Sequence, residues 1–211
     1  MSEFADLTIG VLALQGAFIE HVKMLERLGA KAREVRLPSD LDGLDGLIVP
    51  GGESTTIGKL LVSYELLEPL RHLVDSGFPI YGTCAGTILL AKDIGGLDQP
   101  LLATMDVVVE RNAFGRQLQS FETDLEIAGL GAEPFRAVFI RAPAIKAVGP
   151  TVETLARLEN GTIVAAREGS LLVSCFHPEL TDDDRFHRAF LELVLKLRGK
   201  ANVGEGAATA R

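Results

Sequence analysis

The chain has 211 residues, of which 47% are hydrophobic and 24% charged, enough apolar material for one well-buried core. Its formal net charge of −8 argues against binding to nucleic acid or to an anionic membrane surface, because both require basic patches on the protein. The sequence contains two cysteines and no recognisable signal peptide, and no apolar run approaches the ~18 residues of a membrane span. These features predict a cytoplasmic protein with reduced thiols.

Strand and helix patterns alternate through the first half of the chain. Short apolar runs predict strands at residues 7–14, 32–37, 46–49 and 78–81. Apolar residues at helical spacing predict helices at residues 18–28, 55–74 and 84–93. Strands and helices that alternate at these lengths form right-handed βαβ units, and therefore a parallel sheet with helices on both faces.

The second half of the chain is richer in strand patterns separated by short turns. These strands are expected at residues 105–110, 121–127, 135–140, 162–167 and 171–175. They add an antiparallel edge to the sheet, and Asp182–Asp184 can cap a final helix. We expect a single domain over residues 1–198, an α/β fold with a three-layer, open, mixed but mostly parallel sheet. The tail at residues 199–211 has almost no large apolar residue and is expected to be disordered.

The segment PIYGTCAG, residues 79–86, carries the clearest chemical signal. It predicts a strand, a tight Gly-x-Cys-x-Gly turn and a helix, the arrangement of a nucleophile elbow with Cys in place of Ser. The turn would present the sulfur of Cys84 at the carboxyl end of the sheet and at a helix N-terminus, which favours a thiolate. The alternative is a buried structural cysteine beside a glycine-rich turn.

A nucleophilic cysteine needs a base, and the base needs an orienting partner. The run FHPE follows a predicted strand and offers both, with His177 as the base and Glu179 as the carboxylate that fixes its tautomer. The alternative for FHPE is an ordinary polar turn. His21, His72 and His187 fall within helical patterns, so we expect surface or packing roles for them.

The run PGGES, residues 50–54, also follows a predicted parallel strand, and ligands of open α/β sheets collect at that edge. The backbone N–H groups of Gly51, Gly52 and Ala85 could form an oxyanion hole. The alternative is a flexible turn. A phosphate-binding loop is excluded, because the spacing to the next Gly-Lys pair is one residue too long and no Ser or Thr follows it. The cysteines and histidines are not at zinc-ligand spacings, so no metal is expected.

In this order and separation, PGGES, GTCAG and FHPE resemble the class I (triad) glutamine amidotransferases, which have a flavodoxin-like fold. A closer resemblance is to the PdxT-type glutaminase subunits of pyridoxal 5′-phosphate synthase. It rests on the runs LQGA (14–17), PGGESTT, VERNAFG (109–115), FIRAP (139–143) and FHPELTDD (176–183), and it extends from about Leu7 to Leu197.

The resemblance implies that Cys84 is the nucleophile, His177 the general base and then acid, and Glu179 the orienting carboxylate. It also implies a glutamine site lined by Gly52, Glu53, Ser54, Arg111, Ile140 and Arg141. Free glutamine carries an α-carboxylate and an α-ammonium group, so a selective pocket needs a cation and an acceptor. Without the resemblance, both arginines would be interpreted as solvated surface charges.

The implied reaction is hydrolysis of L-glutamine to L-glutamate and ammonia through a γ-glutamyl thioester, with no metal or organic cofactor. The implied partner is a PdxS-type (β/α)8-barrel synthase subunit in a hetero-oligomer. This partner would combine the ammonia with ribose 5-phosphate and glyceraldehyde 3-phosphate to form pyridoxal 5′-phosphate. Residues 15–17 form either an interface element or a simple turn between strand and helix, and we expect Cys175 to be a structural thiol.

Two further interpretations remain open. One is another enzyme on the same scaffold, either a glutaminase for a different synthase or a γ-glutamyl hydrolase. The other is a non-catalytic regulatory subunit that has kept the fold.

Overall fold

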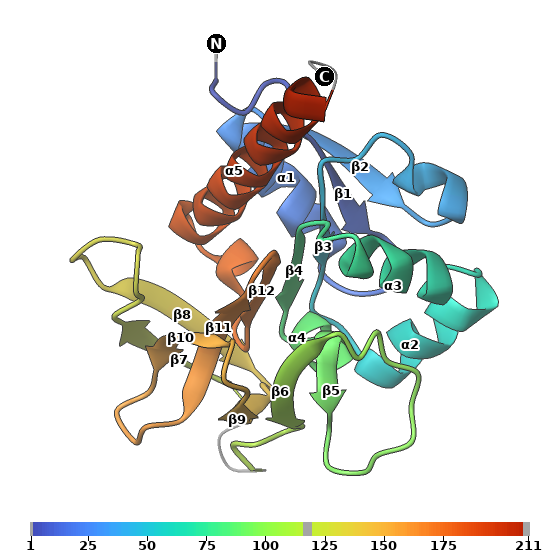
Figure 1. Cartoon of the computed structure of the whole chain (residues 1–211). Helices are drawn as coiled ribbons and strands as arrows, with labels where there is room; N and C mark the ends of the chain where they lie inside the picture. The colour runs from blue at the N-terminus through green and yellow to red at the C-terminus, as the bar shows by residue number, and fades with distance from the viewer. Residues whose placement is uncertain (1, 116–119, 209–211) are drawn as a thin grey trace.

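The computed structural model describes residues 2–115 and 120–208. Within this part of the chain, ten strands form one sheet in the order β2-β1-β3-β4-β12-β11-β9-β6-β5, with β10 paired to β11. Helices cover both faces of the sheet (Figure 1). The predicted fold class, an open, mixed, mostly parallel sheet between helices, is therefore confirmed.

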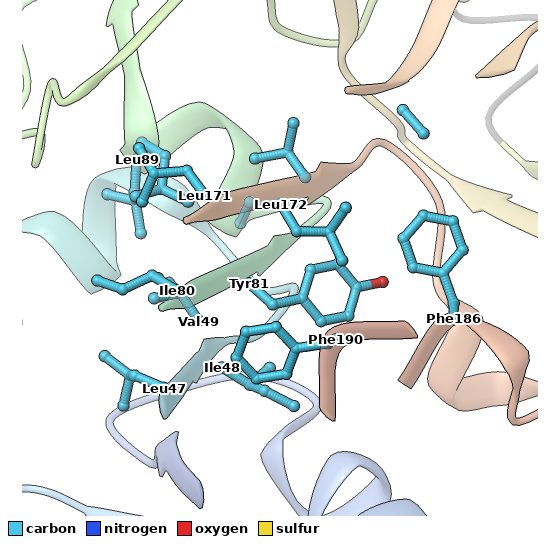
Figure 2. Packing of buried hydrophobic residues seen from close by; sticks show 14 of the residues in the cluster. Leu47, Ile48, Val49, Ile80, Tyr81, Leu89, Leu171, Leu172, Phe186 and Phe190 are labelled. Atoms are coloured by element: carbon cyan, nitrogen blue, oxygen red, sulfur yellow. The ribbon is translucent and has the colours of Figure 1, made fainter. Parts of the chain in front are cut away.

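One half of the sheet consists of parallel strands whose residues are almost all buried, except in the outermost strand at Lys31–Val35. It contains β1 (Thr8–Leu12), β2 (Lys31–Val35), β3 (Gly46–Val49), β4 (Ile80–Thr83) and β12 (Leu171–Ser174). Figure 2 shows that Leu47, Ile80 and Leu171, which are aligned across three neighbouring strands, lie on one face. The next residue of each strand points to the opposite face. The apolar runs predicted from the sequence are the consequence of covering both faces.

The two faces of this sheet are covered by different helices. On one face, Tyr81 stacks on Phe186 with ring centroids 5.5 Å apart and also contacts Phe190 (Figure 2). Both phenylalanines belong to α5 (Arg185–Ala208), which packs beside α1 (Phe18–Leu28). On the other face, Leu89 of α4 (Ala85–Leu90) packs near Ile80, and α4 in turn contacts α2 (Ser54–Ser63).

The prediction of a single helix over residues 55–74 is wrong. The structure has two helices, α2 and α3 (Leu67–Asp75), with a break between them. At the break Glu65 adopts a left-handed φ of 57°, which stops the helical hydrogen-bond ladder. The break is invisible in the hydrophobic pattern because apolar residues continue across it. The helix predicted for residues 84–93 ends early, at Leu90, and the chain continues as the short strand β5 (Ala91–Asp93).

The other half of the sheet is mainly antiparallel, as predicted. It contains β6 (Met105–Glu110), β9 (Ala144–Val148), β10 (Glu153–Arg157) and β11 (Ile163–Glu168). The prediction missed β9 and β10, which are five residues long and have only two buried residues and one, respectively. A separate antiparallel pair contains β7 (Ser120–Leu125) and β8 (Phe135–Ile140).

The hydrophobic core is one continuous cluster that reaches from Phe4 to Val194. Short 3-10 helices lie at η1 (Pro38–Leu41) and η2 (Pro178–Leu180). The backbone of α5 is helical through residues 199–208, which belong to the tail expected to be disordered, and residues 209–211 lie outside the described part of the chain. No helix of the described residues is long and apolar enough to cross a membrane.

The three chemical motifs leave the sheet at the same edge. PGGES follows β3, Cys84 follows β4 and FHPE follows β12, and these strands are parallel neighbours. The backbone N–H of Cys84 donates to the carbonyl of Ser174 at 2.8 Å, which joins the ends of β4 and β12. The fold therefore brings segments more than 120 residues apart in sequence to a common edge.

Candidate active site

Cys84 lies in a strained turn between β4 and α4. Its φ of 48° and ψ of −102° fall outside the regions that non-glycine residues favour. Two glycines make the turn possible. A Cβ at Gly86 would lie 2.1 Å from the carbonyl oxygen of Val49, and one at Gly82 would lie 2.7 Å from the backbone of Gly86. The strand, turn and helix of a nucleophile elbow are therefore present around the sulfur.

His177 and Glu179 lie beside this cysteine. The Nδ1 atom of His177 is 2.7 Å from Oε1 of Glu179, and both side chains are nearly or fully buried. A Cβ at Gly51 would approach both His177 Cε1, at 2.4 Å, and Cys84 Cβ, at 3.3 Å. Gly51 is thus the small residue that allows the imidazole and the thiol to approach each other.

The protonation of this pair follows from its surroundings. Burial lowers the pKa of His177, but the contacts with Cys84 and Glu179 outweigh burial and raise that pKa to about 10. Burial raises the pKa of Glu179, but His21 and His177 outweigh it and hold the pKa below its usual range. Glu179 is therefore an ionised carboxylate that favours an imidazolium at His177.

A cavity of about 590 Å³ opens over the sulfur. Cys84 and His177 line it, and so do all the residues that the sequence analysis assigned to glutamine binding: Gly52, Glu53, Ser54, Arg111, Ile140 and Arg141. Glu179 and Ala85 are buried and do not line it. The structure thus gathers the thiol, the imidazole, one carboxylate and two guanidinium groups around a space of small-molecule size.

Glu53 and Arg111 form an ion pair at the edge of the cavity. Arg111 Nη2 is 3.2 Å from Oε1 of Glu53, and the Glu53 side chain also caps α2 by accepting the N–H groups of Thr55 and Thr56. Although burial acts in the opposite direction, these hydrogen bonds lower the pKa of Glu53 to about 2. The carboxylate is therefore charged at neutral pH and already oriented.

The prediction missed two glutamines that support this ion pair. Gln99 accepts hydrogen bonds from Arg111 Nη1 at 2.9 Å and from Thr55 at 3.0 Å. Gln15 accepts the backbone N–H of Glu53 at 2.8 Å. Gln99 lies in a loop that carries no motif or periodicity, so no sequence signal points to it. Gln15 was noted only as an interface or turn residue.

The three backbone groups proposed for an oxyanion hole are not equivalent. The N–H of Gly51 donates to Thr83 Oγ1 at 3.0 Å, and the carbonyl of Gly51 accepts the N–H of Ala17 at 3.0 Å. Gly51 is thus fixed by its own hydrogen bonds. Ala85 begins α4, where backbone N–H groups have no helical partner, and Gly52 lines the cavity. Gly52 and Ala85 remain the better candidates.

The other groups considered at the sequence level have different environments. Cys175 is fully buried, and burial raises the pKa of its thiol. His21 and His187 are fully buried, whereas His72 is exposed on α3. Among the side chains of residues 2–115 and 120–199, no group of three or more His, Cys, Asp or Glu could hold a metal ion.

Comparison with known proteins connects this site to a family. The model of the SNO glutamine amidotransferase family matches residues 11–196, which is most of the chain. The chain belongs to the SNO glutamine amidotransferase family. This confirms the resemblance on which the sequence analysis relied.

Curated relatives cover the same region of this glutamine amidotransferase. The pyridoxal 5′-phosphate synthase subunit PdxT of Herpetosiphon aurantiacus is 60% identical over 190 residues, which are 89% of this chain and 100% of the relative. The protein of the same name from Moorella thermoacetica is 57% identical over 188 residues, with the same coverage.

Solved structures agree with the family assignment. A crystal structure described as a glutamine amidotransferase has a TM-score of 0.84 and 55% identity, and it covers 88% of this chain and 98% of the other. The structure of PurLQS from Thermotoga maritima has a TM-score of 0.68 at 15% identity, covering 88% of this chain and 98% of the other, and shares the fold alone.

Proposed function

We propose that this chain is the glutamine-hydrolysing subunit of a pyridoxal 5′-phosphate synthase, with Cys84, His177 and Glu179 as its catalytic triad. The observation that carries the proposal is the cavity over the sulfur, where the imidazole, Glu53 and two arginines surround a space that fits a small amino acid. Relatives named as PdxT subunits, at 60% and 57% identity, support the choice of synthase.

In the proposed reaction, His177 takes the proton of Cys84 and the thiolate attacks the side-chain amide carbon of glutamine. The amide oxygen becomes an oxyanion that accepts hydrogen bonds from the backbone N–H groups of Gly52 and Ala85. The imidazolium of His177 then gives its proton to the leaving nitrogen, and ammonia departs. Glu179, hydrogen-bonded to Nδ1, fixes the imidazole tautomer and stabilises the imidazolium.

The second half of the cycle uses the same groups. His177 removes a proton from water, and the resulting hydroxide attacks the carbonyl of the γ-glutamyl thioester. Collapse of the tetrahedral intermediate breaks the carbon–sulfur bond and releases L-glutamate, and the proton on the imidazole returns to the sulfur. No step requires a metal or an organic cofactor.

The polar residues of the cavity match the two charged groups of free glutamine. In the proposal Arg111 and Arg141 bind the α-carboxylate, and Glu53 binds the α-ammonium group. Ser54 and Ile140 complete the pocket. The ion pair between Arg111 and Glu53 keeps both charges in place before the substrate arrives.

We place the synthase partner, a PdxS-type subunit, over the mouth of this cavity. Three large apolar side chains near it are exposed: Ile140 and Leu180 line the cavity, and Ile19 lies in the first turn of α1 beside Ala17. Exposed apolar groups around a site that must pass ammonia onward are typical of a docking surface. We also propose that residues 1–198 form one domain, supported by the continuous core, and that the protein acts in the cytoplasm.

The experiment that tests the proposal measures glutamine turnover with and without a purified PdxS-type subunit. We expect glutamine hydrolysis that depends on Cys84, with Cys84→Ala lowering kcat by about 10³-fold or more. A preference for γ-glutamyl peptides over glutamine would favour a γ-glutamyl hydrolase. Full activity of the complex that contains Cys84→Ala would favour a non-catalytic regulatory subunit. Transfer of ammonia only to a different synthase would show that the proposed partner is wrong.

A further inference from the structure

Three polar side chains lie in the core next to the triad carboxylate. They are His21 of α1, Thr83 of β4 and His187 of α5, and each is 0% exposed. None of them lines the cavity. Buried polar groups almost always have hydrogen-bond partners, because an unpaired one loses its bonds to water without replacement. The partners of these three residues therefore indicate what they do.

His21 is the centre of this group. Its Nδ1 atom is 2.8 Å from Nε2 of His187. Its Nε2 atom is 3.2 Å from Oγ1 of Thr83 and 3.5 Å from Oε2 of Glu179. Thr83 Oγ1 in turn accepts the N–H of Gly51 at 3.0 Å. One imidazole thus contacts both the triad carboxylate and the residue that holds the PGGES loop.

The charge of Glu179 decides the tautomer of His21. Oxygen Oε1 of the carboxylate is taken by His177. Oxygen Oε2 is buried, makes no hydrogen bond within the described part of the chain, and lies 3.5 Å from Nε2 of His21. An ionised carboxylate can only accept, so a proton on His21 Nε2 is favourable and a lone pair there is repulsive. His21 is therefore the Nε2–H tautomer.

The same logic extends to His187. If His21 carries its proton on Nε2, its Nδ1 atom must accept, and so Nε2 of His187 must donate across the 2.8 Å contact. The Nδ1 atom of His187 is then an unprotonated nitrogen. It is buried and has no hydrogen-bond partner among the described residues. This agrees with an unprotonated nitrogen, which carries no N–H that would need an acceptor.

Both imidazoles are expected to be neutral. Burial lowers the pKa of His21, with Glu179 and Glu20 acting against it and His177 acting with it. Burial also lowers the pKa of His187, well below its usual value, and His21 and Arg27 act in the same direction. Tyr81 packs edge-on against both rings, which keeps them apart from water.

We propose that His21 is a positioning residue of the active site, which fixes Glu179 directly and the PGGES loop through Thr83, while His187 donates a hydrogen bond to its Nδ1 atom. The triad carboxylate and the backbone that leads to Gly52 are thereby held by one buried ring. Groups that orient an active-site side chain from behind commonly change its activity when removed. The inference rests on the proposed function, because it assigns a role within the same site.

The first test needs no substitution and no substrate. Nitrogen-15 NMR of the histidine rings in the wild-type protein reports the tautomer of each imidazole. We expect His21 and His187 to be neutral with the proton on Nε2 between pH 6 and 8, a range that spans the ordinary histidine pKa of about 6.5, with the exposed His72 as a reference signal. An Nδ1–H tautomer or an imidazolium at His21 would overturn the proposal.

The second test compares two replacements of His21. Phenylalanine keeps a ring without any N–H, whereas glutamine keeps an N–H donor at similar reach. We expect His21→Phe to lower kcat by about 10- to 100-fold with little change in KM for glutamine, and His21→Gln to recover most of the loss. His72→Phe, on the exposed histidine, is the matched control and should behave as wild type. Turnover is measured with the PdxS-type subunit present.

The pH dependence of Cys84 alkylation by iodoacetamide gives a readout independent of glutamine. Without the N–H that faces Oε2, the ionised form of Glu179 is less stabilised and supports the imidazolium of His177 less strongly. We therefore expect the pH dependence of alkylation in His21→Phe to shift relative to wild type. If kcat falls equally in both His21 variants while the pH dependence of alkylation stays that of wild type, His21 has only a packing role. That result would overturn the proposal. If the alkylation profile of His21→Phe is shifted but the wild-type protein hydrolyses no glutamine, His21 still positions the site. In that case the proposed function is wrong.

If His21→Phe does not fold, Thr83 provides the same test. Thr83→Val keeps the shape and removes the hydroxyl that links His21 to Gly51, whereas Thr83→Ser retains the hydroxyl. We expect a kcat loss of about 10-fold for the valine variant and near wild-type turnover for the serine variant. Equal turnover of the two variants would contradict the proposal.

Discussion

His177 and Glu179 are hydrogen-bonded at 2.7 Å although Pro178 alone separates them in the chain. The proline begins the 3-10 helix η2, with three residues between it and the end of β12, and this turn brings the two side chains within hydrogen-bonding distance. The His177–Glu179 pair is local in sequence, whereas Cys84 and His21 approach it from distant segments of the chain.

Glu179→Gln tests the orienting role of the carboxylate. The amide is nearly isosteric, but its nitrogen can donate to Nδ1 of His177 and so stabilise the wrong imidazole tautomer. We expect kcat for glutamine hydrolysis to fall by about 10²- to 10⁴-fold while the unfolding temperature stays close to that of wild type. Glu159→Gln, at an exposed glutamate after β10, is the control. A kcat within a few-fold of wild type would show that Glu179 is dispensable.

The sequence predicted which motifs come together, because the carboxyl ends of parallel strands share one edge. β3, β6 and β8 have the predicted bounds, and PGGES and Cys84 directly follow strands of the parallel half. Once those strands are recognised, their motifs must lie close together. The cavity residues Arg111 and Arg141, which follow β6 and β8, were predicted from the resemblance alone, because an isolated arginine carries no signal of its own.

Other features depend on contacts that no local pattern reveals. His21 lies four residues before Leu25 and seven before Leu28, on the buried face of α1, so its burial could be predicted from helical spacing. Its partner His187 is 166 residues away, and nothing in the sequence connects the two. The break between α2 and α3 depends on one left-handed residue, Glu65, that periodicity does not detect.

Arg111→Lys tests the recognition of the α-carboxylate. The guanidinium donates to Glu53, Gln99 and Thr55 through three of its five N–H groups, and Arg111 lines the cavity of substrate size. An ammonium group cannot reproduce this planar arrangement of donors. We expect KM for glutamine to rise about 10-fold with a smaller change in kcat.

The control for this arginine is Arg157→Lys, on an exposed side chain that bonds to the carbonyl of Gly161. It should leave both constants unchanged. An unchanged KM in the Arg111 variant would remove Arg111 from the substrate site. Steady-state kinetics at varied glutamine concentration, with the synthase subunit present, separates the two constants.

Gly86→Ala tests the steric basis of the elbow. The added Cβ would lie 2.1 Å from the carbonyl oxygen of Val49, an atom of the neighbouring strand that cannot move without disturbing the sheet. We expect a loss of about 2 kcal/mol or more in the free energy of unfolding, measured by urea denaturation. Gly199→Ala is the control, because a Cβ there meets no atom within 4 Å. Equal stability of the two variants would show that the elbow tolerates a side chain.

Glu53 gives the stability of the fold a specific dependence on pH. Its pKa is lowered to about 2 in the folded state against an ordinary value of 4.5. A carboxylate with a depressed pKa stabilises the folded protein fully above pH 4.5 and loses that contribution as the pH falls toward 2. Since the side chain is half-exposed, water screens its bonds, and we expect the contribution to be no more than about 1 kcal/mol.

The measurement compares the free energy of unfolding of wild type and Glu53→Gln from pH 7 to about pH 2.5, which covers most of the window between the two pKa values of Glu53. The difference should be constant above pH 4.5 and shrink below it, because the wild-type carboxyl becomes neutral like the amide. A difference that does not change with pH would mean that Glu53 stabilises α2 through its shape as a helix cap and not through its charge.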